Sequence, residues 1–144
     1  MFSKATEYAL RAVIFIARET HAGHRPGLDA IAEAIDSPKP FTAKILQQLT
    51  ADHSIVQSVK GPHGGFYLAE KAIRLPVKTI LKVMGEEDKL NKCVLGLYAC
   101  SEKKPCPMHA EYKIIREQMT RLFESTTIGM LSSDEGKMKT VLHV

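Results

Sequence analysis

The residues best suited to a chemical role are the three cysteines of the chain, Cys93, Cys100 and Cys106, which are followed closely by His109. Thiolates are the usual ligands of iron–sulfur clusters, and zinc sites combine thiolates with imidazole. The spacing C-x6-C-x5-C lets a flexible loop bring all three sulfurs to one cluster, and it lacks the close C-x2-C pairs typical of structural zinc. The pattern therefore predicts a metal site, and favours an iron–sulfur cluster of two or four irons.

Alternative roles for these three thiols have weaker chemical support. An odd number of cysteines in a reducing compartment argues against structural disulfides, and ordinary free cysteines are usually buried singly. Zinc is a chemical competitor, and exposed thiolates lose clusters in air, so the cofactor can be absent from purified protein. Cys106 precedes Pro107, which favours a helix N-terminus where free N–H groups stabilise the thiolate. His109 would then lie on the same side of the first turn, as a candidate fourth ligand.

Composition sets broad limits on the rest of the molecule. The chain has 144 residues, a net charge of +4 and a pI near 9.0. This length supports one ordinary core. No apolar run reaches the roughly 20 residues that cross a bilayer, and the first residues lack a signal-peptide pattern, so we expect a cytoplasmic protein without a membrane partner. The positive charge suits a polyanionic partner, but its spread along the chain makes it weak support.

The first half of the chain carries the elements of a DNA-binding unit. Apolar residues at three- and four-residue spacing predict helices over residues 4–20, 28–35 and 41–51. Short β-branched and aromatic runs at residues 55–59 and 66–68 flank a glycine-rich turn, which predicts a β-hairpin. This order is that of a winged helix-turn-helix, with the third helix in the major groove and the hairpin as the wing.

The third helix supplies the candidate base contacts. We expect it to bury Phe41 with three aliphatic residues and to expose its polar side chains, because only one stripe of the helix faces the core. Lysines mostly neutralise phosphates, whereas Thr and Gln read base edges. The predicted contacts with double-stranded DNA are Lys39, Thr42, Lys44 and Gln48 from the helix, with Lys60 and His63 from the wing.

The second half is predicted to hold the cysteine loop and a subunit-pairing helix. We expect a short helix at residues 77–84, a loop over 86–105 and a long amphipathic helix over 107–125. The apolar stripe of the long helix is typical of helix pairing, and it consists of Tyr112, Ile115, Met119 and Leu122. Docking on its own domain is the alternative. A homodimer is preferred, because paired half-sites give a small helix-turn-helix enough contact area.

These elements define the expected fold class and organisation. The fold is mainly α with a small β-hairpin wing, that is, a winged helix-turn-helix followed by a long C-terminal dimerisation helix. Residues 1–75 form the DNA-binding domain, and residues 76–131 carry the cysteine loop and the dimerisation helix. The polar tail, residues 132–144, is expected to be mobile.

Three segments together resemble the Rrf2 family of bacterial regulators. They are the opening TEYALRA at residues 6–12, the wing VKGPHGGFYL at residues 59–68, and the cysteine triplet. The likeness spans residues 1–131, and the family includes IscR-like, NsrR-like and RirA-like regulators. It implies a homodimeric winged-helix transcription factor, commonly a repressor, whose iron–sulfur cluster responds to nitric oxide, redox or iron status and controls operator binding.

The resemblance leaves two candidates for the fourth cluster ligand. In NsrR-like members a carboxylate near the start of the first helix comes from the partner subunit, and Glu7 falls at the matching position. In IscR-like members the ligand resembles His109. The chain departs from many relatives at Pro38 and Pro40, where those carry small hydroxyl residues, so no operator sequence is implied.

The sequence also leaves room for different classes of function. A cluster-free regulator of the same fold, responding through thiol chemistry or a metabolite, is the alternative function. An enzyme is disfavoured, because the chain has neither a C-x-x-C redox pair nor a nucleotide-binding motif. A protein-interaction role without DNA is the remaining possibility.

Overall fold

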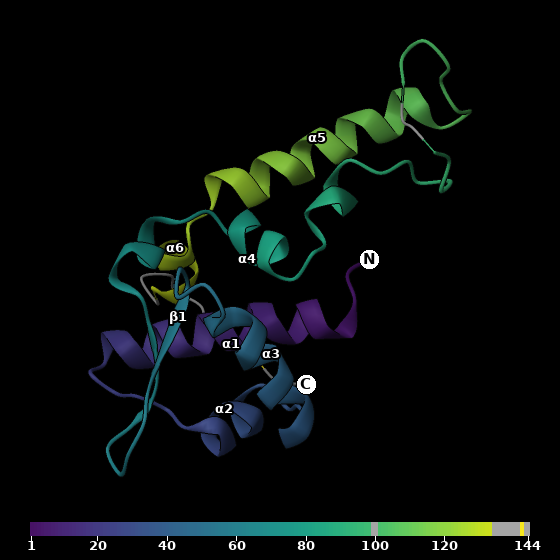
Figure 1. Ribbon diagram of the computed structural model, residues 1–144. Coiled ribbons are helices and arrows are strands. Elements are labelled where there is room, and N and C mark those ends of the chain that lie inside the picture. The colour runs from purple at the N-terminus through teal and green to yellow at the C-terminus, as the bar shows by residue number, and fades with distance from the viewer. Residues whose placement is uncertain (99–100, 134–141, 143–144) are drawn as a thin grey trace.

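The computed structural model describes residues 1–98, 101–133 and 142 (Figure 1). Its first half contains three helices and a hairpin: α1 (Lys4–His21), α2 (Leu28–Ala34), α3 (Lys39–Thr50), β1 (Val56–Val59) and β2 (Gly65–Leu68). The two strands pair antiparallel, with Val56 opposite Leu68 and Val59 opposite Gly65. The predicted mainly helical fold with a two-stranded hairpin is confirmed.

The described part of the second half adds two 3-10 helices and three α-helices: η1 (Glu70–Arg74), α4 (Lys78–Val83), η2 (Glu87–Leu90), α5 (His109–Ser125) and α6 (Ile128–Ser132). Figure 1 shows α5 as a long rod held away from the three N-terminal helices, with α4 between them. None of the helices in the described part of the chain combines the length and apolarity needed to span a membrane.

Helix α1 organises the core. Ser3 caps its first turn, since the Ser3 hydroxyl accepts the Thr6 N–H at 3.2 Å. One face of the helix is fully buried against α3, β2, α4 and α6, and its buried residues include Ala9, Ala12, Val13, Ile16 and Ala17. Ile80 of α4 and Ile128 of α6 belong to the same apolar cluster, so α6 returns to pack on the first helix of the chain.

Helix α3 corrects one prediction about its faces. Thr42 has no exposed surface, and its hydroxyl donates to the Pro38 carbonyl at 3.0 Å. It completes the buried stripe with Ile45, Leu46 and Leu49. Phe41, expected inside, is 36% exposed and packs edge-to-face on Tyr8 with ring centroids 5.7 Å apart. The assignment of Thr42 as an exposed base-reading residue is therefore wrong.

The hairpin is tied to the loop before α2. The Phe66 N–H donates to the Pro26 carbonyl at 2.8 Å. A side chain at Gly65 would collide with the Arg25 carbonyl, so the close approach of the two segments requires glycine there. The Arg25 guanidinium lies over the Tyr67 ring, 5.1 Å from its centroid. These contacts fix the base of the wing.

The C-terminal elements shift several predicted boundaries. Helix α5 begins at His109 and not at residue 107, and the expected loop over 86–105 contains η2. Helix α6 was not predicted, and it extends through Ser132, where the tail was expected to begin. Most of that tail lies outside the described residues, as does Cys100.

Candidate cysteine site and nucleic-acid interface

Two of the three predicted cysteine ligands meet in space. Cys93 follows η2 and Cys106 precedes α5, yet their Sγ atoms lie 3.8 Å apart and both thiols are free. This separation is too long for a disulfide bond of about 2.05 Å. It matches the roughly 3.8 Å expected between two thiolates bound at about 2.3 Å to one tetrahedral metal ion. Cys93 is 7% exposed, so the pair is partly shielded from solvent.

The loop around Cys93 stabilises an anionic sulfur. The Leu95 backbone N–H makes the largest contribution to lowering the pKa of the Cys93 thiol; burial opposes it, and the Leu97 N–H, the Cys106 thiol and the Arg116 charge add to it. Between these two residues, Gly96 adopts a φ of +69°, and its own N–H donates to the Cys93 carbonyl at 3.0 Å, which closes a tight turn beside the sulfur. Hydrogen bonds to the sulfur tune thiolate-bound clusters. The donor set and its cradle thus fit a thiolate-bound metal group.

Cys106 occupies a different place from the one predicted. It lies two residues before Met108, the N-cap of α5, and its carbonyl accepts the His109 N–H at 3.0 Å. His109 is the first residue of α5 and is half-buried beside this turn. This hydrogen bond holds Cys106 and His109 in one turn of the backbone at the start of α5.

Glu7 lies on the first turn of α1, where its carboxylate pairs with Lys4 at 3.2 Å. Within residues 1–98 and 101–133, no three His, Cys, Asp or Glu side chains gather closely enough to hold a metal ion. Cys100, the third predicted ligand, lies outside the described residues.

Contacts with α5 and η2 hold both ends of the cysteine loop. The Lys113 ammonium of α5 pairs with Glu102 in the C-terminal part of the loop. At the other end Leu90 is fully buried, which anchors η2 three residues before Cys93. The thiol pair is therefore attached to two packed elements.

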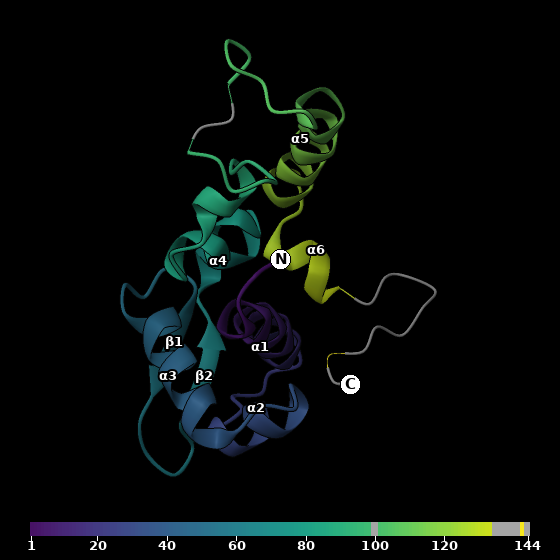
Figure 2. The same cartoon turned by 90° about the vertical axis from the view of Figure 1, so that its right-hand side faces the viewer.

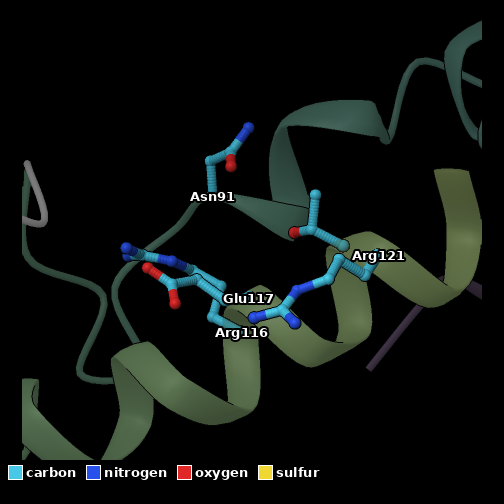
Figure 3. A pocket seen from close by; sticks show the side chains of 5 residues that line it. Asn91, Arg116, Glu117 and Arg121 are labelled. Atoms are coloured by element: carbon cyan, nitrogen blue, oxygen red, sulfur yellow. The ribbon is translucent and has the colours of Figure 1, made fainter.

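A hollow of about 260 Å³ separates the end of η2 from α5 (Figure 3). Asn91 enters it from one side, and Arg116, Glu117, Thr120 and Arg121 line it from α5. Because Arg116 lowers the pKa of Cys93 by its charge, this side of α5 supplies positive potential behind the thiol pair.

Five of the six predicted DNA contacts are exposed. Lys44 and Gln48 project from α3, and Lys60 and His63 lie at the turn of the hairpin. Lys39 is also exposed, but its ammonium pairs with Asp29 of α2 at 2.6 Å. A hollow of about 290 Å³, lined in part by Gln47 and Phe66, separates α3 from the hairpin. Helix α3 and the wing are thus two separate surfaces, each with exposed polar side chains that could contact DNA.

Sequence reasoning did not single out Arg25 or Glu86. Arg25 is an exposed cation beside the wing, positioned by the Tyr67 ring. No sequence motif marks either residue, since Arg25 lies in the short loop over residues 23–27 and Glu86 lies at the start of the predicted loop after residue 85. Their significance comes from contacts between segments far apart in the sequence.

A helix-turn-helix followed by a two-stranded wing defines a winged-helix regulator. Residues 2–134 match the Rrf2 family, which is described as an iron-dependent transcriptional regulator, and the chain belongs to that family. A protein of Aquifex aeolicus described as an HTH-type transcriptional regulator is 32% identical over 139 residues, which are 95% of this chain and 94% of that one. The HTH-type transcriptional regulator IscR of Escherichia coli is 25% identical over 131 residues, 89% of this chain and 77% of its own.

Solved structures agree with the fold. CymR, the global cysteine regulator of B. subtilis, is similar with a TM-score of 0.71 and 18% identity, over 92% of this chain and 95% of its own. IscR of T. potens is similar with a TM-score of 0.68 and 18% identity, over 97% of this chain and 93% of its own. The predicted winged-helix fold and family are confirmed. The chain is a transcriptional regulator and not an enzyme, as its family and relatives indicate.

Proposed function

We propose that this chain is a homodimeric DNA-binding repressor whose operator affinity is controlled by an iron–sulfur cluster held by Cys93, Cys100 and Cys106. The observation that carries the proposal is the convergence of the Cys93 and Cys106 thiols to 3.8 Å at the start of α5. When bound, such a cluster supplies iron that reacts with nitric oxide, oxygen or electrons. The residues of the chain bind it, shield it and connect it to the helices that contact DNA.

The exposed face of α5 supports the homodimer. No residue of this 17-residue helix is buried. Ile115 and Leu122 are 57% and 60% exposed, and Ile114 adds to the same surface. Apolar residues gathered on one exposed helix face mark an interaction site, and a second copy of the same helix offers a matching face. We therefore place the two-fold axis of the dimer beside α5.

The fourth ligand is either His109 of the same chain or Glu7 of the partner subunit. His109 is favoured by its position three residues after Cys106. Glu7 requires that α1 of one subunit reach the cysteine loop of the other. Substitution distinguishes them, because only the true ligand changes the absorption spectrum of the loaded protein.

DNA binding uses α3 and the wing. Lys44 and Gln48 contact the major groove, while Lys60 and His63 contact phosphates or the adjacent minor groove. Lys39 must break its ion pair with Asp29 before it can contact a phosphate, so it adds less than the other lysines to the free energy of DNA binding.

The test is anaerobic purification, followed by iron and acid-labile sulfide analysis, visible absorption and gel shifts with DNA from upstream of the gene. We expect iron and sulfide in the parent, and a change in DNA affinity when a chelator removes them. Cys93→Ser, Cys100→Ser and Cys106→Ser should each lose both the cluster and this change. Ser101→Ala, in the same loop, is the control. Absence of iron and sulfide, with DNA binding unaltered in all three serine variants, would refute the proposal.

A second candidate is a thiol switch, which the same 3.8 Å separation supports. A peroxide would take two electrons from the Cys93 and Cys106 thiols, forming one S–S bond while the two protons leave and the peroxide is reduced to water. Peptide mass spectrometry after peroxide treatment of cluster-free protein tests this. A Cys93–Cys106 disulfide that changes DNA binding, in protein that never takes up iron, would favour this function over the cluster.

A further inference from the structure

The first turn of α1 is held by a carboxylate from a distant part of the chain. The Ser3 N–H donates to both Glu86 carboxylate oxygens, at 3.1 and 3.3 Å, across 83 residues of sequence. The Thr6 side chain also helps to lower the pKa of this carboxyl. Lys89 completes the arrangement, with its ammonium 2.8 Å from Glu86 Oε1.

Glu86 therefore acts on α1 as an anion at a helix N-terminus. The unpaired N–H groups and the macrodipole make that end of an 18-residue helix positive. The Glu86 side chain is 12% exposed, so water competes weakly for the carboxylate. Burial alone raises its pKa, but the hydrogen bonds from Lys89, Thr6 and Ser3 prevail and lower the pKa to about 2.

The position of Glu86 connects two functional parts of the molecule. It is the N-cap of η2, which leads directly to Cys93. Beside it, Phe2 packs edge-to-face on Phe123 of α5, with ring centroids 5.5 Å apart. Figures 1 and 2 both place the start of the chain between α1 and the region of α4 and α5. A displacement of η2 would thus act on the helix against which α3 packs.

We propose that Glu86 is a positioning residue that couples the cysteine site to the DNA-binding helices by holding the first turn of α1 against η2. The inference rests on the proposed function, since it requires two states of the cysteine site. Occupation or loss of the group held by Cys93 moves the segment 86–93, and Glu86 carries that movement to Ser3 and Thr6. The same turn carries Glu7, so its position relative to a partner subunit depends on this contact as well.

The test compares Glu86→Gln with Glu87→Gln in the full-length protein. Gln keeps the size of the side chain but removes the charge and one acceptor. Glu87 is the next residue and the first of η2, and its side chain is 40% exposed and lies 3.5 Å from the Lys78 ammonium, which makes it the matched control. Each protein is loaded anaerobically with iron and sulfide or stripped with a chelator. The readout is the ratio of the two dissociation constants for DNA from upstream of the gene.

We expect Glu86→Gln to bind iron and sulfide as the parent does while its affinity ratio falls at least about threefold toward one. Glu87→Gln should keep the parent's ratio. A merely structural role would weaken both states equally and leave the ratio unchanged. If Glu86→Gln does not fold, Thr6→Val removes the hydroxyl that helps to lower the pKa of the same carboxyl, and it should lower the ratio less.

The outcomes separate the two proposals. A parent ratio of one refutes the proposed function and the coupling with it. A parent ratio above one that the folded Glu86→Gln or Thr6→Val protein retains refutes the coupling alone. A ratio that falls equally in Glu86→Gln and Glu87→Gln also overturns the assignment to Glu86.

Discussion

At the scale of single residues, the carboxyl of Glu86 has the largest pKa shift among the described residues, and it makes folding depend on pH. Its pKa of about 2 lies below the ordinary value of 4.5, so it stabilises the fold above pH 4.5 and loses this effect as the pH falls from there through 2. At about 1.4 kcal/mol per pKa unit, the upper bound on this contribution is about 3 to 4 kcal/mol, and screening by solvent makes the actual contribution smaller.

We expect Glu86→Gln to lower the free energy of unfolding at pH 7, with the difference from the parent shrinking between pH 5 and pH 2.5. Urea denaturation across this range measures it. Glu87→Gln is the control for removal of a nearby negative charge. A difference that stays constant with pH would show that the Glu86 carboxylate is not the group responsible.

Thr42 and Gln48 lie on the same helix but should respond oppositely to substitution. Thr42 is buried, so Thr42→Val should cost about 1 kcal/mol of stability through its lost hydrogen bond to Pro38, with base preference unchanged. Gln48 is exposed, so Gln48→Ala should leave stability unchanged and alter preference among DNA sequences. Urea denaturation and binding to a library of variant sites measure the two effects. Altered base preference in Thr42→Val would contradict the buried position.

At the scale of elements, α5 presents its apolar residues to two different partners. Phe123, Tyr112 and Met119 are half-buried on the near side of the helix, and Phe123 packs on the core. Ile115 and Leu122 stay more than half exposed. The stripe predicted as one pairing surface is therefore divided between intramolecular packing and the proposed subunit contact.

We expect Ile115→Glu to convert the proposed dimer to a monomer, because a dimer would bury the new charge without a partner. The monomer should keep its fold, since Ile115 is exposed within one chain. Sedimentation velocity over a range of concentrations measures the change. Glu117→Lys, on another side of α5, alters charge on the same helix and should leave the dimer intact. Equal dissociation of both variants would locate the interface elsewhere.

The elements that sequence predicted well are those with strong periodic patterns. Helix α1, helix α3 and the hairpin were found within a few residues, because each buries a regular set of apolar side chains. The helices η1, η2 and α6 are too short for such a pattern, and tertiary contacts hold them. The burial of Phe41 and the exposure of Thr42 were predicted wrongly, because hydrophobicity alone ranks Phe above Thr. A Thr hydroxyl that donates to the Pro38 carbonyl is readily buried.

The cysteine site was only partly accessible from sequence. Spacing identified the residue types, and the structure brings Cys93 and Cys106 together as expected. The N–H groups of Leu95 and Leu97 that support Cys93 depend on the turn at Gly96, which no cysteine motif encodes. Likewise, the contact between Ser3 and Glu86 joins residues that are remote in sequence, and only the packed fold brings them together.

At the scale of the whole molecule, two wings in one dimer should double the salt effect of a single substitution. Each phosphate contact changes the slope of log affinity against log salt by about 0.9. Lys60 lies at the exposed turn of the hairpin, and a dimer on a complete operator presents it twice. We therefore expect Lys60→Ala to reduce the slope by about 1.8 on a full operator and by about 0.9 on a half-site.

Fluorescence anisotropy between about 50 and 200 mM salt measures both slopes on DNA duplexes of equal length. Lys103→Ala, an exposed lysine of the cysteine loop, is the control and should leave both slopes at the parent's values. Because the comparison is between two DNAs with one protein, it separates the number of wings engaged from any general loss of positive charge. A reduction of the same size on the full operator and the half-site would mean that only one subunit places its wing on DNA.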